Sequence, residues 1–307
     1  MLGSFHINKC TINPQINLRG FFDSNPERRA LVSQQTGIRA YDSIPALLAD
    51  VDAVILATPA STHLEMGRIC LNAKKHLLIE KPLAESQSEG YELVELAAHN
   101  NVVLHVGHSE AHNAAFAKLM TYKPQPRFIE VHRLASYSPR GTDVSVVLDL
   151  MVHDIQLILR LCGEEPLYNA IAATGVPVIS DDIDIANVRL TFPSGCVANL
   201  TASRFSAKKM RKLRLFEKDN YFSINLNKGE IEHYRLIREP VTPPAMPVAF
   251  NTETVEPVDA LETEQQAFVD AIHGRPNSGV TGTEALRILK VTDAILSQIA
   301  ARPVRNQ

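Results

Sequence analysis

Tryptophan is absent from this chain of 307 residues, and aromatic side chains make up only 6% of it. A basic excess is also missing, because 31 Lys and Arg stand against 34 Asp and Glu, for a net charge of −3. Proteins that bind duplex nucleic acid usually carry a broad basic excess to replace counterions. The charge balance therefore disfavours a nucleic-acid partner, and the 45% of hydrophobic residues excludes disorder as the overall state.

Long hydrophobic runs and export signals are missing as well. The longest apolar runs, such as residues 51–57, are far too short to cross a bilayer. The opening MLGSFHINKC has no basic segment followed by an apolar one, as a signal peptide would. The four cysteines form no CxxC pair, which is typical of buried thiols in a reducing compartment. We expect a cytoplasmic, soluble protein without a membrane partner.

Short apolar runs alternate with helical patterns through the first 110 residues. The patterns predict strands over 16–23, 38–41, 51–59, 76–82 and 101–108, separated by helices over 25–36, 44–49, 62–73 and 86–100. Several of these strands are continuously apolar, as in strands buried on both faces. The alternation predicts right-handed βαβ units and an α/β fold with a doubly wound parallel sheet.

The pattern changes after about residue 125. It predicts a strand over 126–137, an amphipathic helix over 144–161, an antiparallel meander over 167–234, an irregular segment over 239–257 and closing helices over 260–273 and 283–300. We therefore expect two domains, residues 1–122 and residues 123–307. The second is expected to be α+β with a mostly antiparallel open sheet, its terminal helices packing back on the first domain.

A dinucleotide-cofactor signature is present but incomplete at the start of the chain. Such a fold needs a Gly-rich turn after its first strand and an acidic residue about 20 positions later for the ribose hydroxyls. Gly3 and Asp23 stand at that spacing, but the strand and the two earlier glycines that should precede Gly3 are absent. A turn glycine and a helix-capping Asp would explain the same pair.

Polar residues follow three of the predicted parallel strands. ATPASTH opens a helix and places small residues and a proline where a second nucleotide would lie, and EKPL ends the next strand. Because ligands bind at the carboxyl ends of such strands, we expect Thr58, Lys81 and His108 to converge there. A buried lysine is costly unless it is paired or functional, so Lys81 is either a reactive group or the partner of Glu80 or another carboxylate.

The segment VVLDLMVHDIQLIL places Asp149 and His153 four residues apart, on one face of a helix. An imidazole oriented by a carboxylate is what a general base requires when an alcohol is oxidised. A satisfied core histidine is the alternative interpretation. Asp154 lies about 100° further round the helix, where it could cap, pair or contact substrate.

A group of histidines and a run of basic residues are weaker candidates for a functional site. His105, His108 and His112 are close in sequence, but no Cys or carboxylate completes a metal set, and we predict no metal site. The basic run KKMRKLR over 208–214 is interpreted as a solvated or subunit-interface edge rather than a phosphate or nucleic-acid contact.

In combination, several motifs resemble the Gfo/Idh/MocA oxidoreductases: Gly3 with His6, Asp23-x-x-Pro26, ATPASTH, EKPLA, VGHSE, DLMVHD and the closing EQQAFVDAIHGRPNSGVTGTEALRIL. Single motifs are common, but their order and spacing along nearly the whole chain are specific. The resemblance implies an NAD(P)-binding Rossmann domain, followed by a substrate domain whose open sheet packs in homodimers or homotetramers. It implies reversible hydride transfer between NAD(P) and a secondary alcohol of a sugar or cyclitol.

The resemblance also implies roles for individual residues. Lys81 matches the catalytic lysine, His153 its acid/base partner, and Asp149 the group that orients the histidine or holds substrate. Asp23 would read the adenosine ribose of NAD, whereas Ser24 and Arg28 keep NADP open as a cofactor. The remaining expected cofactor contacts are Gly3, Thr58, Pro59, His63, Glu80, Lys81 and His108.

Within the family, VHRLASYSPRGTDVSVVLDLMVHDIQLI is similar to a branch that acts on nucleotide sugars such as UDP-N-acetylglucosamine. By this resemblance Arg133, Arg140, Asp143 and Asp154 would lie near the substrate. Arginines suit a diphosphate because they donate bidentate hydrogen bonds. Surface charge on a strand and loop is the alternative. The chain departs from the family at Ala111-His112, where relatives commonly have Arg-Phe.

The largest departure from the family is the missing first strand, because Met1-Leu2-Gly3 fits only the tail of a Gly-x-Gly-x-x-Gly motif. We expect either that the chain begins inside its natural reading frame or that it is a shortened relative. Two other functions stay open. One is a non-catalytic ligand-binding or scaffolding member that has lost cofactor binding, and the other is a dehydrogenase of a free sugar, inositol or dihydrodiol.

Overall fold

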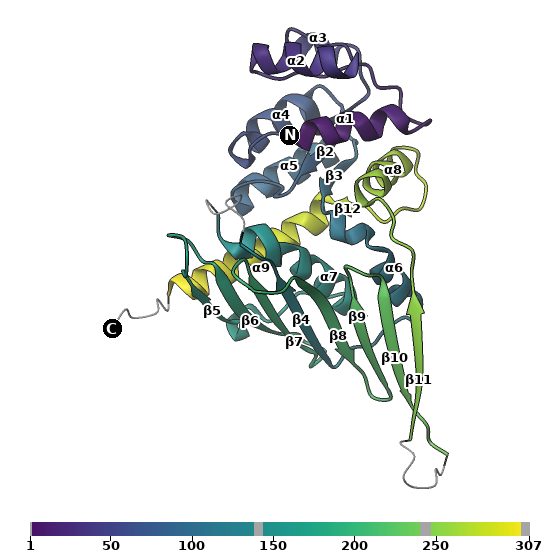
Figure 1. The fold of residues 1–307 in the computed structure, drawn as a ribbon. Coiled ribbons are helices and arrows are strands. Elements are labelled where there is room, and N and C mark those ends of the chain that lie inside the picture. The colour runs from purple at the N-terminus through teal and green to yellow at the C-terminus, as the bar shows by residue number, and fades with distance from the viewer. Residues whose placement is uncertain (1, 138–143, 240–246, 302–307) are drawn as a thin grey trace. The chain divides into compact units, whose positions relative to one another are not determined.

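The computed structural model describes residues 2–137, 144–239 and 247–301, and these fall into two compact units (Figure 1). The first unit comprises Met1–His112 and Asp259–Leu289. The second comprises Asn113–Val258 and Lys290–Gln307. Each unit has a sheet of its own, so the candidate site residues are placed by two separate frameworks.

The first unit contains a sheet of order β1-β2-β3-β12, in which the first three strands are parallel. Its strands are β1 (Ala53–Leu56), β2 (His76–Glu80), β3 (Leu104–Gly107) and the two-residue β12 (Val280–Thr281), antiparallel to β3. Its helices are α1 (Leu2–Ile12), α2 (Pro26–Thr36), α3 (Ile44–Leu48), α4 (His63–Asn72), α5 (Gln87–His99) and α8 (Ala260–Ile272), with short 3-10 turns η1 (Ala60–Thr62) and η2 (Ser109–His112). Leu77, Leu78 and Ile79 of β2 are all buried, which explains the continuous apolar run.

The strands expected over 16–23 and 38–41 do not form, and this prediction is wrong. Among the described residues these segments share a single parallel bridge between Phe21 and Ala40. Two backbone hydrogen bonds make that bridge, from Phe21 N to Arg39 O at 3.0 Å and from Tyr41 N to Phe21 O at 2.8 Å. A strand needs a neighbour along its length, and an isolated pair of strands is only marginally stable in water.

The second unit contains an eight-stranded sheet of order β11-β10-β9-β8-β4-β7-β6-β5. Its strands are β4 (Phe128–Leu134), β5 (Ala172–Val176), β6 (Ile185–Thr191), β7 (Val197–Ser203), β8 (Met210–Phe216), β9 (Asn220–Asn225), β10 (Glu230–Leu236) and β11 (Val248–Thr254). The β4–β7 pair is parallel and every other pair is antiparallel. The helical elements are α6 (Ala114–Thr121), η3 (Val147–Met151), α7 (Val152–Cys162) and the 3-10 turn η4 (Tyr168–Ala170). The closing α9 (Gly282–Ala300) belongs to the first unit as far as Leu289 and to the second from Lys290.

Two expectations about this sheet are corrected. The segment 239–257, expected to be irregular, contains β11, which pairs with β10 along seven residues. Its Pro-rich part over 240–246 lies outside the described residues. The basic run 208–214 is not at a sheet edge, because β8 lies between β4 and β9.

The two faces of this sheet differ in chemistry. On one face, Ile129 and Val131 of β4 are buried in the core. Helices α6 and α7 pack against this sheet (Figure 1). On the opposite face five aromatic rings stand side by side across neighbouring strands, with centroid separations of 4.6–5.6 Å: Phe128, Phe216, Tyr221, Tyr234 and Phe250. We call this set the aromatic row. Within the described part of the chain, no helix has the length and apolar character needed to span a membrane.

Candidate functional site

The carboxyl ends of β1 and β2 are joined by a buried histidine. Thr58 and Pro59 lie exposed in the loop after β1, and His63 follows at the start of α4. The His63 ring is 1% exposed and lies between two carbonyl oxygens, with Nδ1 2.7 Å from Pro82 O and Nε2 3.0 Å from Thr58 O. Because carbonyl oxygens only accept, the ring donates to at least one of them and fixes both loops.

Lys81 follows β2 directly and is half-buried, and His108 follows β3 directly and is buried. The sequence therefore places Thr58, Lys81 and His108 at the carboxyl ends of three adjacent parallel strands, as expected for a ligand-binding edge. Gly107 leaves room for the neighbouring carboxylate, since a Cβ there would lie 2.9 Å from Glu80 Oε2.

Glu80 belongs to a buried network that joins β2 to α1 and α8. His6 Nε2 lies 2.7 Å from Glu80 Oε1, while Gln265 Nε2 lies 3.0 Å from His6 Nδ1 and 3.2 Å from His6 O. Since the carbonyl oxygen only accepts, the group of Gln265 that faces His6 is its NH₂. His6 Nδ1 therefore accepts a hydrogen bond, and Nε2 carries the proton that is donated to Glu80.

Glu264 completes this network as a neutral acid. It is 3% exposed, and burial, together with the charge of Glu80, raises its pKa to about 9. The potential ligand atoms of His6, Glu80 and Glu264 lie within 4.8 Å of one another, as in a metal site. A metal would need a lone pair on His6 Nε2, where the hydrogen-bonding pattern places a proton. The set is therefore better described as a buried polar network, in which His6 is hydrogen-bonded to Glu80 and Gln265 and Glu264 is the neighbouring carboxyl group with the raised pKa.

Asp23, the residue expected to contact the cofactor ribose, lies shortly before α2. Its Oδ1 accepts a hydrogen bond from Asn25 N at 2.8 Å, and its Oδ2 lies 3.6 Å from Arg28 Nη1. The carboxylate is 27% exposed, so it retains acceptor capacity for a hydroxyl group. Ser24 and Arg28 are exposed beside it. Gly3 lies half-buried in α1.

In the second unit, the helix expected over 144–161 begins with a π turn. The amide of Val152 reaches the carbonyl of Val147, five residues earlier, and Asp149 lies within this turn. Asp149 and His153 are both half-buried. Such turns are rare and often occur at functional sites, because the wider turn redirects side chains.

Arg133 and Asp154, both expected near the substrate, form a buried ion pair. Each is 2% exposed, and Arg133 Nε and Nη2 donate to the Asp154 carboxylate at 2.7–2.9 Å. The pair satisfies its own charges inside the second unit, and a contact of either residue with substrate stays a prediction. Arg140 and Asp143 lie outside the described residues.

Comparison with known proteins identifies the class of enzyme. Residues 1–108 match the oxidoreductase family with an NAD-binding Rossmann fold, and residues 121–232 match the GFO/IDH/MocA C-terminal domain. The chain therefore belongs to the Gfo/Idh/MocA family of NAD-binding oxidoreductases, as the motifs predicted. NAD is the expected cofactor of this family.

Particular members of the family are similar to this chain over nearly its whole length. The chain is 36% identical to UDP-N-acetylglucosamine 3-dehydrogenase of Acidithiobacillus ferrooxidans over 94% of this chain and 91% of the relative. A solved structure of that enzyme superimposes with a TM-score of 0.90, covering 98% of this chain and 95% of the other. An inositol 2-dehydrogenase of Rhizobium meliloti is 23% identical over 98% of this chain and 94% of its own length.

The sequence analysis missed four residues that the structure brings into buried polar networks. Glu264 and Gln265 lie in the closing segment EQQAFVDAI, whose Glu and Gln at successive positions beside buried apolar residues were a usable signal. Asp184 and Arg204 are separated by two strands, and no local spacing indicates that they meet. His6 was noted as part of a motif, but without a role.

Proposed function

We propose that this protein is an NAD-dependent dehydrogenase of a nucleotide sugar, with UDP-N-acetylglucosamine as the first candidate substrate. The observation that carries the proposal is the 36% identity, over 94% of the chain, to an enzyme named for oxidising this sugar nucleotide at its 3-position. The superposition of this chain on a solved structure of that enzyme, with a TM-score of 0.90, supports it.

The proposed chemistry assigns the proton transfers to this chain and the hydride transfer to the cofactor. When bound, NAD accepts the hydride of the oxidised carbon. Lys81 is proposed to polarise the reacting hydroxyl as an ammonium, which stabilises a developing alkoxide at this strand end, or to deprotonate it as the neutral amine, which takes up the proton. The hydrogen bond from His6 to Glu80 supports this role by holding the residue next to Lys81.

His153 is proposed as the acid/base partner, with Asp149 orienting its ring or holding substrate. Both residues lie on the η3–α7 helix and are half-buried. Arg133 and Asp154, with Arg140 and Asp143, remain proposed substrate contacts. A bidentate arginine would suit the diphosphate of the sugar nucleotide.

Asp23 is proposed to favour NAD over NADP, because a 2′-phosphate beside its carboxylate would be repelled. Arg28 works against this preference, since its guanidinium lies 3.6 Å from Asp23 and is 61% exposed. The remaining proposed cofactor contacts are Gly3, Ser24, Thr58, Pro59, His63, Glu80, Lys81 and His108.

A homodimer or homotetramer through the open face of the second sheet is part of the proposal. The aromatic row lies on that face, and Phe250 at its end is 58% exposed. Stacked rings on a solvent-facing sheet are a common basis for association. Arg214 and Glu130 pair on the same face at 2.8 Å and would add polar contacts. A cytoplasmic location is also proposed, in keeping with four free cysteines.

The test is NADH formation at 340 nm with purified protein and UDP-N-acetylglucosamine, UDP-glucose, N-acetylglucosamine or myo-inositol. We expect turnover with the first and competitive inhibition by UDP alone. Turnover with myo-inositol and no inhibition by UDP would instead indicate a free-polyol dehydrogenase. Binding of NADH, followed by fluorescence, without turnover of any substrate would favour the non-catalytic alternative.

A further inference from the structure

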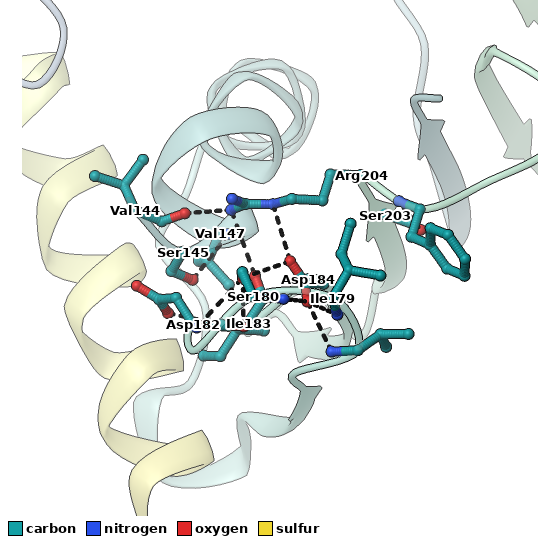
Figure 2. Close-up of polar contacts among 12 residues, drawn as sticks. Val144, Ser145, Val147, Ile179, Ser180, Asp182, Ile183, Asp184, Ser203 and Arg204 are labelled. Atoms are coloured by element: carbon teal, nitrogen blue, oxygen red, sulfur yellow. Dashed lines mark hydrogen bonds and ion pairs between the residues drawn. The ribbon is translucent and has the colours of Figure 1, made fainter. Parts of the chain in front are cut away.

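Asp184 and Arg204 form a buried ion pair beside the start of the helix that carries Asp149 and His153. Asp184 is 0% and Arg204 6% exposed, and Arg204 Nε lies 3.6 Å from Asp184 Oδ1 (Figure 2). Asp184 directly precedes β6 and Arg204 directly follows β7, and these two strands are neighbours. A buried pair persists only where further hydrogen bonds satisfy its remaining polar atoms, so its partners show what it holds.

The Asp184 carboxylate holds the loop that precedes it. The amides of Val178, Ile179 and Ser180 donate to Oδ2 at 2.7, 2.7 and 2.9 Å, and the Ser180 hydroxyl donates to Oδ1 at 2.7 Å. Burial alone would raise the pKa of Asp184, but these hydrogen bonds outweigh it and lower the pKa to about 2. Asp184 is therefore a charged anchor at all physiological pH values.

The Arg204 guanidinium holds the chain just before the helix. Its Nη2 donates to the carbonyl oxygen of Val144 and lies 3.4 Å from that of Ile183. The Ile183 carbonyl also accepts from the amide of Val146 at 2.9 Å. The anchored loop and the guanidinium thus fix Val144 and Val146 together, as Figure 2 shows for the guanidinium.

Ser145 connects this fixed backbone to the helical turn η3 through two hydrogen bonds. Ser145 Oγ accepts from Val147 N at 3.1 Å, and Ser145 O accepts from Asp149 N at 3.0 Å. Val147 opens the π turn η3, whose i-to-i+5 hydrogen bond ends at Val152. Because a helix is stiff, the direction of its first turn sets where Asp149 and His153 point.

We propose that Arg204 and Asp184 are positioning residues for proton transfer, which act by fixing the backbone from Val144 to Val146 and with it the orientation of η3. They act through that backbone, so neither is called catalytic. The kinetic consequence rests on the proposed function, whereas the structural consequence does not. The two consequences can be measured separately.

The kinetic test uses Arg204→Lys, which keeps the charge but loses the planar fork, and Asp184→Asn. The matched control is Arg189→Lys, at an exposed arginine on β6 whose Nη1 donates to Asn199 Oδ1 at 3.3 Å. We expect kcat to fall about 10- to 100-fold in the two test variants, because misplacement of catalytic groups by about 1 Å has effects of this size. The KM for NAD should stay within about twofold, because Asp23 and its loop belong to the other unit.

The pH profile separates positioning from general support of the fold. In Arg204→Lys we expect the pKa of the limb of log kcat that reports His153 to move, whereas Arg189→Lys should retain the parent profile. A folded Arg204→Lys protein with the parent kcat and the parent pH profile would overturn the proposal.

Hydrogen exchange tests the same claim without any substrate. We expect the amides of Val146, Val147 and Asp149 to exchange about tenfold faster in Arg204→Lys, while the amides of β6 exchange as in the parent protein. If the parent protein turns over no substrate, the proposed function fails, and this measurement still decides whether Arg204 holds η3. Unchanged exchange would overturn it.

A milder variant keeps the test open if the two main variants do not fold. Ser180→Ala removes only the hydroxyl that donates to Asp184 Oδ1 at 2.7 Å. We expect faster exchange at Val146 by about two- to fivefold and a proportionately smaller fall in kcat. Ser180→Ala protein with parent exchange and parent kcat would overturn the proposal.

Discussion

Each unit contains a carboxyl group that is almost wholly removed from solvent, and the pKa values of the two groups are shifted in opposite directions. Glu264 of the first unit is 3% exposed and Asp184 of the second is 0% exposed. Burial and the neighbouring Glu80 raise the pKa of Glu264 to about 9. Burial would raise that of Asp184 too, but hydrogen bonds from three amides and a hydroxyl lower it to about 2.

The difference lies in the donors rather than in the depth of burial. Asp184 faces three amides, a hydroxyl and a guanidinium, all of which favour the ionised form. Glu264 faces another carboxylate, and its Oε2 has no hydrogen-bond partner among the described residues. Burial disfavours charge in both places, and only the ring of donors reverses that preference. The surroundings of Glu264 favour its protonated form, whereas the hydrogen bonds to Asp184 hold the loop before β6.

Replacing Asp184 should have the largest effect on stability. Asp184→Asn puts an NH₂ opposite backbone amides that only donate and removes the negative charge that pairs with Arg204. We expect the free energy of unfolding in urea to fall by about 3–5 kcal/mol. The control Asp181→Asn, at an exposed position of the same loop, should change it by less than about 0.5 kcal/mol. Equal losses in the two variants would contradict the assigned difference.

Replacing Glu264 should have a smaller effect that depends on pH. The folded-state pKa is about 9, against an ordinary value of 4.5, so the folded protein retains a proton that the unfolded chain releases. The stability that comes from this proton is fully present below about pH 4.5 and is lost as the pH rises towards 9.

Glu264→Gln keeps the neutral group at every pH, so it should flatten that decline. We expect a gain of about 2–4 kcal/mol in the free energy of unfolding at pH 8 and little change at pH 5. The control is Glu262→Gln, on the same helix but with a side chain that is 51% exposed. A Glu264→Gln protein that unfolds with the parent pH dependence would show that Glu264 is ionised in the parent.

Gly107→Ala should disturb the network of His6, Glu80 and Gln265, because the added methyl group would contact Glu80. A Cβ at this position would lie 2.9 Å from Glu80 Oε2, so the carboxylate must move. We expect a loss of about 1–3 kcal/mol in the free energy of unfolding. Gly3→Ala, where nothing lies within 4 Å of the new Cβ, should not lose stability. Thermal unfolding of both variants tests the contact with Glu80. Equal melting temperatures would contradict it.

Ser180→Ala should give the smallest change in stability, because it removes one of four donors to Asp184. We expect a loss of about 1 kcal/mol in urea unfolding at neutral pH. The pKa of Asp184 should rise from about 2, which acid unfolding of the variant would show as an earlier onset on lowering the pH. An onset at the parent pH would indicate that the amides alone hold the charge.

The fold was predictable where one element imposes a period on the sequence. The buried strand β2 gives an unbroken apolar run, and α4, α5 and α8 start at polar caps or within strongly amphipathic segments. The prediction was wrong where strand formation depends on pairing with a segment distant in the sequence. Residues 16–23 have the composition of a strand but share only one bridge with residue 40. The two-residue β12 is too short to produce a period at all.

The candidate site was predictable to the extent that its residues lie at strand ends or on one helix. Lys81 and His108 follow parallel strands directly, and Asp149 and His153 share the η3–α7 segment. The interior pairs Arg133–Asp154 and Asp184–Arg204 join residues about 20 positions apart through the sheet. No local rule predicts such contacts, because the first depends on how α7 packs against β4 and the second on the register between β6 and β7.

The measurement that tests the central claim most directly is kcat for NADH formation from UDP-N-acetylglucosamine in the parent protein and in Lys81→Met. We expect kcat to fall about 10²- to 10⁴-fold in the variant, with the melting temperature nearly unchanged. Lys74→Met, at an exposed lysine before β2, should retain the parent rate. A Lys81→Met protein that turns over at the parent rate would contradict the assignment of the proton transfer to Lys81.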